Sequence, residues 1–203
     1  MTDTNCWGVI AIKGPGQRKA RLAGVLGSAE RDRLAVEMFR HVLGVTAALL
    51  GPGRTVVVSP SALHLPVGTE ALQDDGRCLN AAFDLGRRRA FASGADQVLL
   101  LPADLPALQR TDLEAMLGAG RGVRVVLAPS RSGEGTNGLL LDSVARAFPL
   151  AFGPGSFHAH RRAALSSGMN WELVRRAGLE ADVDHPADLE DPSLGPLLAA
   201  TGA

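Results

Sequence analysis

The sequence predicts an α/β fold in which a mostly parallel sheet carries helices on both faces. Short apolar runs alternate with longer segments of helical periodicity, as is typical of strands joined by crossover helices. These runs are 7–12, 55–58, 97–101 and 123–128. The chain has 203 residues, 46% of them hydrophobic, which suits one domain with one buried core. We expect a single domain over 1–203, with its core at about 7–191 and a loose tail after about residue 192.

Local signals place the individual elements along the chain. The longest helix is expected from residue 28 to about 50, because Leu34, Met38 and Val42 follow each other at four-residue spacing. Ser28 is expected to cap this helix. The other strands are expected at 67–72, 138–141 and 171–175. The other helices are expected at 79–93, from the capping box TDLE at 111–114, at 157–167 behind a Ser156 cap, and as a turn at 186–190.

The composition excludes several classes of protein. The formal net charge is zero, with 21 basic and 21 acidic residues, so neither nucleic acid nor a membrane surface is an expected partner. The two cysteines, Cys6 and Cys78, form no CxxC motif and indicate neither a disulfide framework nor a zinc site. The N-terminus lacks a basic segment followed by a long apolar run, and no run approaches 18 apolar residues, so a cytoplasmic protein is expected.

A basic loop follows the first predicted strand, KGPGQRKAR at 13–21. In parallel α/β folds, ligands bind beyond the carboxyl ends of the strands. Glycines let backbone N–H groups approach a ligand, and cations neutralise phosphate oxygens. The chain has only two lysines, Lys13 and Lys19, and both lie in this loop. The loop matches neither a Walker A motif nor GxGxxG, and a solvated basic loop is the alternative interpretation.

Carboxylates lie in two further segments. Asp104 follows a buried strand in the sequence PADLP, where two prolines restrict the backbone, and it could bind a divalent metal or cap a turn. Asp182 and Asp184 are two residues apart, so in an extended segment they point to the same side. Two adjacent like charges favour a cation between them, although an acidic loop is the alternative. Together the three carboxylates could hold one Mg²⁺.

Two small, hydroxyl-rich segments, GTN at 135–137 and FGPGS at 152–156, could bind an anion or simply form turns. The histidines His158 and His160 do not share a helical face, so a shared metal is not indicated; an anion contact by His160 or a surface position is expected. No serine or cysteine has a base and an orienting group nearby in the sequence, so a covalent nucleophile is not indicated.

The ordered set of these motifs resembles the CofC/FbiD family of guanylyltransferases. The likeness covers roughly residues 7–191 and rests on the strand-end lysine with KARL six residues on, PADLP, GTN, FGPGSFxxH and DVDHPADL. The family makes a guanosine-diphosphate conjugate of a phosphorylated three-carbon acid for coenzyme F(420) biosynthesis. The resemblance implies a nucleotide-diphospho-sugar-transferase-like (MobA-like) fold.

The resemblance also implies roles for individual residues, with GTP and a small phosphorylated acid as substrates and Mg²⁺ as cofactor. It implies metal binding by Asp104, Asp182 and Asp184, acceptor binding by Thr136, Gly153, Ser156 and His160, and GTP-phosphate binding by Lys13, Lys19 and Arg21, of which Lys19 and Arg21 are catalytic. A homodimer is one candidate assembly, and the product would pass to the next enzyme of the coenzyme pathway.

The basic loop departs from the family pattern K-P-L-x-x-A-K-[ST]-R-L. Gly14-Pro15-Gly16 replaces Pro-Leu, and Ala20 replaces the hydroxyl residue after Lys19. Family members use 2-phospho-L-lactate, phosphoenolpyruvate or 3-phospho-D-glycerate, and the atypical loop favours the third. A molybdopterin or sugar-phosphate nucleotidyltransferase is a weaker alternative because the GGxSxRMG-type loop is absent. A non-catalytic nucleotide-binding regulatory domain is the alternative of another class.

Overall fold

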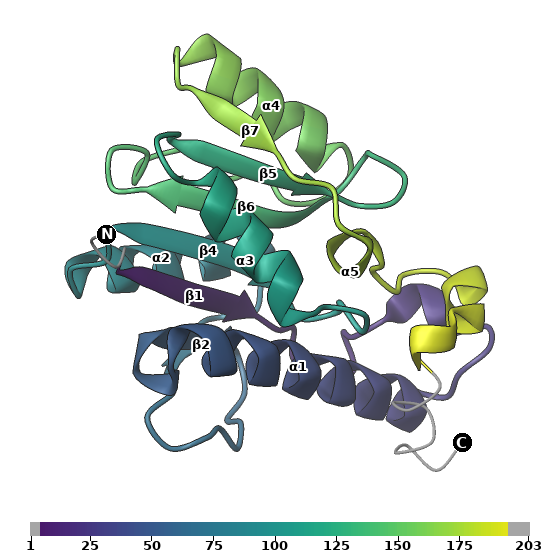
Figure 1. Ribbon diagram of the computed structural model, residues 1–203. Helices are drawn as coiled ribbons and strands as arrows, with labels where there is room; N and C mark the ends of the chain where they lie inside the picture. Colours follow the sequence, from purple (N-terminus) through teal and green to yellow (C-terminus); the bar gives the residue numbers. More distant parts are fainter. Residues whose placement is uncertain (1–4, 195–203) are drawn as a thin grey trace.

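The computed structural model describes residues 5–194 as three layers, with one central sheet between two layers of helices (Figure 1). The strands are β1 (Cys6–Ala11), β2 (Thr55–Ser59), β3 (Glu70–Gln73), β4 (Gln97–Pro102), β5 (Val125–Pro129), β6 (Thr136–Asp142) and β7 (Trp171–Leu173). They form one seven-stranded sheet in the order β3-β2-β1-β4-β6-β5-β7.

Five helices accompany the sheet, with short 3₁₀ turns between them. They are α1 (Ser28–Leu50), α2 (Leu79–Ala92), α3 (Arg110–Ala119), α4 (Ser156–Ser166) and α5 (Ala177–Glu180). Side chains of α1 and α3 pack in one core cluster with one side of the strands, and side chains of α2 and α4 pack in a second cluster with the other side. Both faces of the sheet are therefore covered, which explains why the strands are almost continuously apolar.

The predicted fold class is confirmed, because most of the strand pairs are parallel. β1 pairs parallel with both β2 and β4, β2 with β3, and β5 with β7. The exception is β6, which is antiparallel to its neighbours β4 and β5. Only six residues, 130–135, connect β5 to β6, too few for the crossover that a parallel pair requires.

The ends of two helices differ from the prediction. Gly27, not Ser28, is the N-cap of α1; the Glu30 side chain accepts a hydrogen bond from its backbone N–H at 2.6 Å. The capping box of α3 likewise begins at Gln109, whose N–H donates to Asp112 at 2.9 Å. Both predicted caps lie one or two residues after the observed ones. An acidic side chain three residues after the cap can accept a hydrogen bond from the backbone N–H of the cap residue, so no hydroxyl is needed at the cap.

Two weaker predictions also change. The short strand expected at 67–72 begins at Glu70, since 66–69 form a turn closed by a hydrogen bond from Thr69 N to Pro66 O. The tail does not loosen at residue 192, because a 3₁₀ turn follows and Leu194 is buried against Leu22 and Leu34. The rest of that tail, 195–203, lies outside the described residues.

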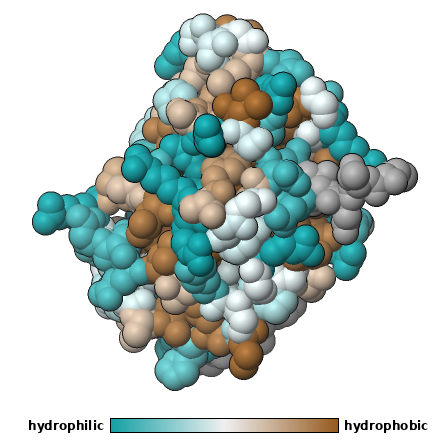
Figure 2. Space-filling model, turned by 90° about the vertical axis from the view of Figure 1, so that its left-hand side faces the viewer, coloured by the Kyte–Doolittle hydropathy of each residue, from teal (hydrophilic) through white to brown (hydrophobic). Residues whose placement is uncertain are grey.

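This C-terminal segment lies beside the loop that follows β1, although the two are far apart in the sequence (Figure 1). The surface itself offers little contiguous apolar area on the face in Figure 2, where apolar patches alternate with polar ones. Within 5–194, none of the helices combines the length and the apolar character needed to span a bilayer.

Candidate active site

A cavity of about 1070 Å³ opens at the carboxyl ends of β1 and β4. The segments that follow these strands line it, together with the start of β6, the start of α4 and the segment after α5. All but one of the predicted site residues border this cavity: Lys13, Lys19, Arg21, Asp104, Thr136, Gly153, Ser156, Asp182 and Asp184. The exception is His160. Residues far apart in the sequence are thus brought together, such as Lys19 and Asp184, which are 165 positions apart.

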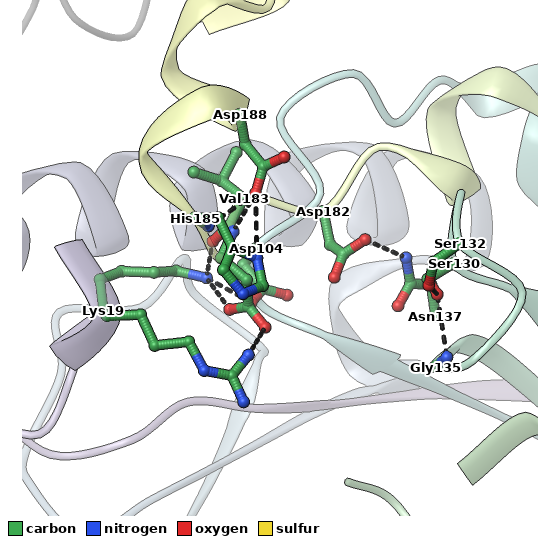
Figure 3. Close-up of polar contacts among 12 residues, drawn as sticks. Lys19, Asp104, Ser130, Ser132, Gly135, Asn137, Asp182, Val183, His185 and Asp188 are labelled. Carbon is green, nitrogen blue, oxygen red and sulfur yellow. Dashed lines mark hydrogen bonds and ion pairs between the residues drawn. The ribbon is translucent and has the colours of Figure 1, made fainter. Parts of the chain in front are cut away.

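Lys19 occupies the centre of the charged part of the cavity. Its ammonium donates to Asp104 at 2.5 Å and also contacts the backbone carbonyl of Val183 (Figure 3). The same nitrogen lies 3.4 Å from a carboxylate oxygen of Asp184. Lys19 also has a φ of 51°, which makes it the one non-glycine residue with a positive φ among residues 5–194. A left-handed conformation at a residue with a side chain costs on the order of 1 kcal/mol, so the surrounding contacts must hold it there.

The net electrostatic effect on Lys19 favours the charged form. Burial by itself would lower the pKa of the ammonium, because its side chain is only 7% exposed. The carboxylates of Asp104 and Asp184 more than offset burial, so the pKa of Lys19 is raised. Arg21 adds a second cation, with a guanidinium nitrogen 3.0 Å from Asp184. The structure therefore joins the basic loop directly to two of the predicted metal-binding acids.

Asp182 lies apart from this ion pair and points toward Asn137 (Figure 3). The Asn137 amide donates to Asp182 at 3.0 Å and to the Leu179 carbonyl at 2.9 Å. Burial raises the pKa of Asp182, and repulsion from Asp104 and Asp184 raises it further, against the opposing effect of the Asn137 hydrogen bond. Asn137 was part of the GTN motif but had no predicted role. The structure makes it the residue that orients Asp182.

The three acids suit a hard divalent cation by their chemistry, since all supply carboxylate oxygens. The repulsion that Asp182 receives from the other two is what a cation among them would relieve. Among the described residues, no three histidine, cysteine, aspartate or glutamate side chains are already gathered closely enough to hold a metal ion. The ammonium of Lys19 lies between Asp104 and Asp184 instead. Metal binding therefore requires local side-chain movement.

A buried hydrogen-bond chain supports the other side of the cavity. The backbone N–H of Ala151 donates to Nε2 of His160 at 2.9 Å, so Nε2 carries no proton. The proton of the neutral ring is then on Nδ1, which lies 2.9 Å from the Thr136 hydroxyl oxygen. Thr136 accepts this hydrogen bond, and its own hydroxyl proton is left to be donated to a ligand. His160 thus sets the donor direction of a cavity-lining hydroxyl.

The expectations for His160 and Ser156 need correction. His160 is neither at the surface nor at the cavity wall: its exposed fraction is 0% because it packs among Phe148, Phe152 and the residues of β6. Ser156 does not cap α4, since the helix begins at Ser156 and Gly155 is the N-cap. The Ser156 hydroxyl instead accepts a hydrogen bond from the backbone N–H of Thr136 at 2.8 Å. Both residues fix Thr136 in place.

Burial of His160 predicts a loss of stability in acid. Burial lowers the pKa of His160 to about 4. The unfolded chain, with a histidine pKa of about 6.5, therefore binds a proton between pH 6.5 and 4 that the folded chain does not. Over this range the free energy of unfolding should fall with decreasing pH, by on the order of 3 kcal/mol from this residue.

The measurement is urea unfolding at pH 7 and pH 4.5 for the unaltered protein, His160→Asn and His158→Asn. His158 is an exposed histidine on the same helix and serves as the matched control. The pH dependence should become shallower only in His160→Asn. An equal pH dependence in all three proteins would contradict the assignment.

Comparison with known proteins places the chain among transferases. Residues 7–194 match the family model described as "Guanylyl transferase CofC like". A phosphoenolpyruvate guanylyltransferase of Rubrobacter xylanophilus is 40% identical, covering 89% of this chain and 90% of the relative. A 3-phospho-D-glycerate guanylyltransferase of Phenylobacterium zucineum is 35% identical over 93% and 89% of the two chains. A 2-phospho-L-lactate guanylyltransferase of Methanopyrus kandleri is 34% identical over 92% and 90%.

The fold has counterparts among solved structures. A crystal structure of a nucleotide-diphospho-sugar transferase from Desulfovibrio desulfuricans superposes with a TM-score of 0.74, covering 98% of this chain and 96% of the other, at 15% identity. At that identity the likeness concerns the fold alone.

Proposed function

Because the chain belongs to the CofC-like family of guanylyl transferases, we propose that it transfers GMP from GTP to the phosphate of a three-carbon phosphorylated acid. One observation carries the proposal: the basic loop after β1 and the acids after β4 and α5 border one cavity. Its size, about 1070 Å³, accommodates a nucleoside triphosphate together with a small acid.

The proposed reaction is a displacement at the α-phosphorus of GTP. A phosphate oxygen of the acceptor attacks this phosphorus and forms a new P–O–P bond, while the bond to the β-phosphate bridging oxygen breaks and pyrophosphate leaves. The acceptor supplies the nucleophile, so the protein needs no nucleophilic side chain of its own. Its contribution is positioning and neutralisation of charge.

The chain's residues divide this task between two sides of the cavity. The Thr136 hydroxyl and the glycine-rich turn at 153–155 would hold the acceptor, with Thr136 kept in its donating orientation by His160. Lys13, Lys19 and Arg21 would hold the triphosphate, and Lys19 and Arg21 also hold Asp104 and Asp184 in place. Positioned cations of this kind stabilise a departing pyrophosphate.

Asp104, Asp182 and Asp184 would hold Mg²⁺. The bound ion would neutralise phosphate oxygens around the reacting phosphorus. The hydrogen bond from Asn137 would keep the half-buried Asp182 carboxylate in its orientation while the Lys19 ammonium moves aside for the ion.

The identity of the acceptor is a finer part of the proposal. The relative at 40% identity is named for phosphoenolpyruvate, whereas the departures in the basic loop favoured 3-phospho-D-glycerate. The higher identity supports phosphoenolpyruvate as the first acceptor to test. The product would then be an activated phosphoacid for coenzyme F(420) biosynthesis, passed to the next enzyme of that pathway.

A second function has less support. A molybdopterin or sugar-phosphate nucleotidyltransferase shares the fold, but the relatives from 34% to 40% identity are named for phosphoacids. A non-catalytic regulatory domain would have no need for three carboxylates and a buried lysine around one cavity.

The test is pyrophosphate release from GTP and Mg²⁺ with phosphoenolpyruvate, 3-phospho-D-glycerate and 2-phospho-L-lactate in parallel. We expect turnover with one acid to exceed the others by about tenfold or more in kcat/KM, because an extra or missing polar group in a shaped site is discriminated at that level. Comparable kcat/KM for all three would argue against a dedicated acceptor. No release with any of them, while GTP still binds, would favour the regulatory alternative.

A further inference from the structure

Arg18 is the cation of the basic loop that no prediction above assigned. It lines the cavity, yet the residue as a whole is only 6% exposed. Its Nε donates to the backbone carbonyl of Lys13 at 2.7 Å, which fixes the start of the guanidinium. The terminal nitrogens Nη1 and Nη2 have no hydrogen-bond partner among residues 5–194. Neither of them is among the fully buried polar atoms that lack a partner, so both keep some accessible surface. They are therefore free to bind a ligand in the cavity.

The charges around Arg18 leave it without a counter-ion. No carboxylate of the described part of the chain forms an ion pair with it. Asp32 on α1 acts on it electrostatically, but both carboxylate oxygens of Asp32 accept from the backbone N–H of Gly16 at 3.1 Å. Burial lowers the pKa of the Arg18 guanidinium, and Asp32 only partly opposes this. A buried cation in this state is unfavourable unless an anion joins it.

Lys19 and Arg21 differ from Arg18 in this respect. Both are already paired with carboxylates, Lys19 with Asp104 and Arg21 with Asp184. Within the described part of the loop, the cationic groups that have no carboxylate partner are thus the Arg18 guanidinium and the exposed Lys13 ammonium.

We propose that Arg18 binds the β- and γ-phosphates of the nucleotide and holds the leaving pyrophosphate. The inference rests on the proposed function, because it assumes that a nucleoside triphosphate occupies the cavity. The position of Arg18 favours the nucleotide over the acceptor, because its Nε is anchored at Lys13 and not on the side of the cavity that Thr136 and Ser156 form. Lys13 also lines a small neighbouring hollow, together with Pro60 and Leu79, and neither Thr136 nor Ser156 lines that hollow. A planar guanidinium with two free donors is well suited to phosphate oxygens.

A purely structural role for Arg18 can be separated from phosphate binding by the choice of substitution. In Arg18→Gln the amide nitrogen takes the place of Nε along the side chain, so the hydrogen bond to the Lys13 carbonyl can be kept while Nη1, Nη2 and the charge are removed. Arg33→Gln is the matched control, because Arg33 is an exposed arginine on α1 outside the cavity.

The experiment measures binding of inorganic pyrophosphate by isothermal titration calorimetry, without GTP, acceptor or turnover. We expect Arg18→Gln to raise the Kd for pyrophosphate by about tenfold or more, the loss typical of a charge-assisted hydrogen bond, and Arg33→Gln to leave it unchanged. The Kd for phosphoenolpyruvate, titrated separately, should be the same in all three proteins.

Three results would overturn the inference. They are a pyrophosphate Kd within twofold of the unaltered protein in Arg18→Gln, weakening of phosphoenolpyruvate binding instead of pyrophosphate binding, or no pyrophosphate binding by an unaltered protein that does transfer GMP. Because binding is measured apart from turnover, failure of GMP transfer would count against the proposed function and not against Arg18.

Discussion

Asp104→Asn should lower kcat for GMP transfer by about 100-fold or more while leaving the fold intact, because it removes a charge at the reacting centre. Asp104 lies two residues after the end of β4 and accepts a hydrogen bond from Lys19 at 2.5 Å. Its side chain is 26% exposed, and Lys19 is its one side-chain partner among the described residues, so few packing contacts depend on it. Asparagine keeps the shape and removes the charge that would hold both the ammonium and Mg²⁺. Asp104→Ala and Asp184→Ala should have the same effect on kcat.

The measurements are kcat with GTP and the best acceptor, and the midpoint of thermal unfolding. Asp75→Asn is the control, because Asp75 is an exposed carboxylate outside the cavity that pairs only with Arg77 within the described residues. Near-normal kcat in Asp104→Asn would contradict the assignment of Asp104 as a ligand of Mg²⁺. A large fall in the unfolding midpoint would instead indicate a structural role.

Lys19→Met should reduce both kcat and stability. The substitution keeps an unbranched side chain, one atom shorter, but leaves Asp104 and Asp184 facing each other without the ammonium between them. We expect kcat to fall by about 100-fold or more. The free energy of unfolding should fall by about 1–3 kcal/mol, below the cost of breaking a fully buried pair because both carboxylates are partly exposed.

Added Mg²⁺ provides a readout that does not depend on turnover. If the ion binds among the carboxylates, it should raise the unfolding midpoint more in Lys19→Met than in the unaltered protein, because no ammonium competes for them. Lys13→Met is the control for stability, since Lys13 is exposed and its side chain has no partner among the described residues. An equal response to Mg²⁺ in all three proteins would show that the ammonium and the ion do not share these carboxylates.

Much of the fold could be predicted because its signals are local. The buried run QVLLLP of β4 and the three- and four-residue apolar spacing of α1 each reflect a period that a few neighbouring residues define. The helix caps were less predictable. A glycine served as the cap of α1 with Glu30 closing the turn, so the residue with the best intrinsic preference, Ser28, was not the one used.

The antiparallel position of β6 could not be predicted from its sequence. The apolar run LLL of β6 does not distinguish it from a parallel strand, and its direction depends on the short connection to β5 and on the space between β4 and β5. The burial of His160 could not be predicted either. The two histidines at the start of α4 lie on different faces of the helix, and the sequence does not show which face packs against the sheet.

The sequence alone identified most of the residues that border the site. The segments after β1 and β4 could be expected to meet there, because the carboxyl ends of parallel strands lie at one edge of a sheet. Only the tertiary structure decided how those residues pair. Lys19 and Asp104 are 85 residues apart, and Lys19 and Asp184 are 165 apart. Such contacts depend on the tertiary fold of the whole chain. The fold pairs Lys19 and Arg21 with carboxylates and places His160 behind Thr136. It also leaves Arg18 as a buried cation that has no carboxylate partner among the described residues.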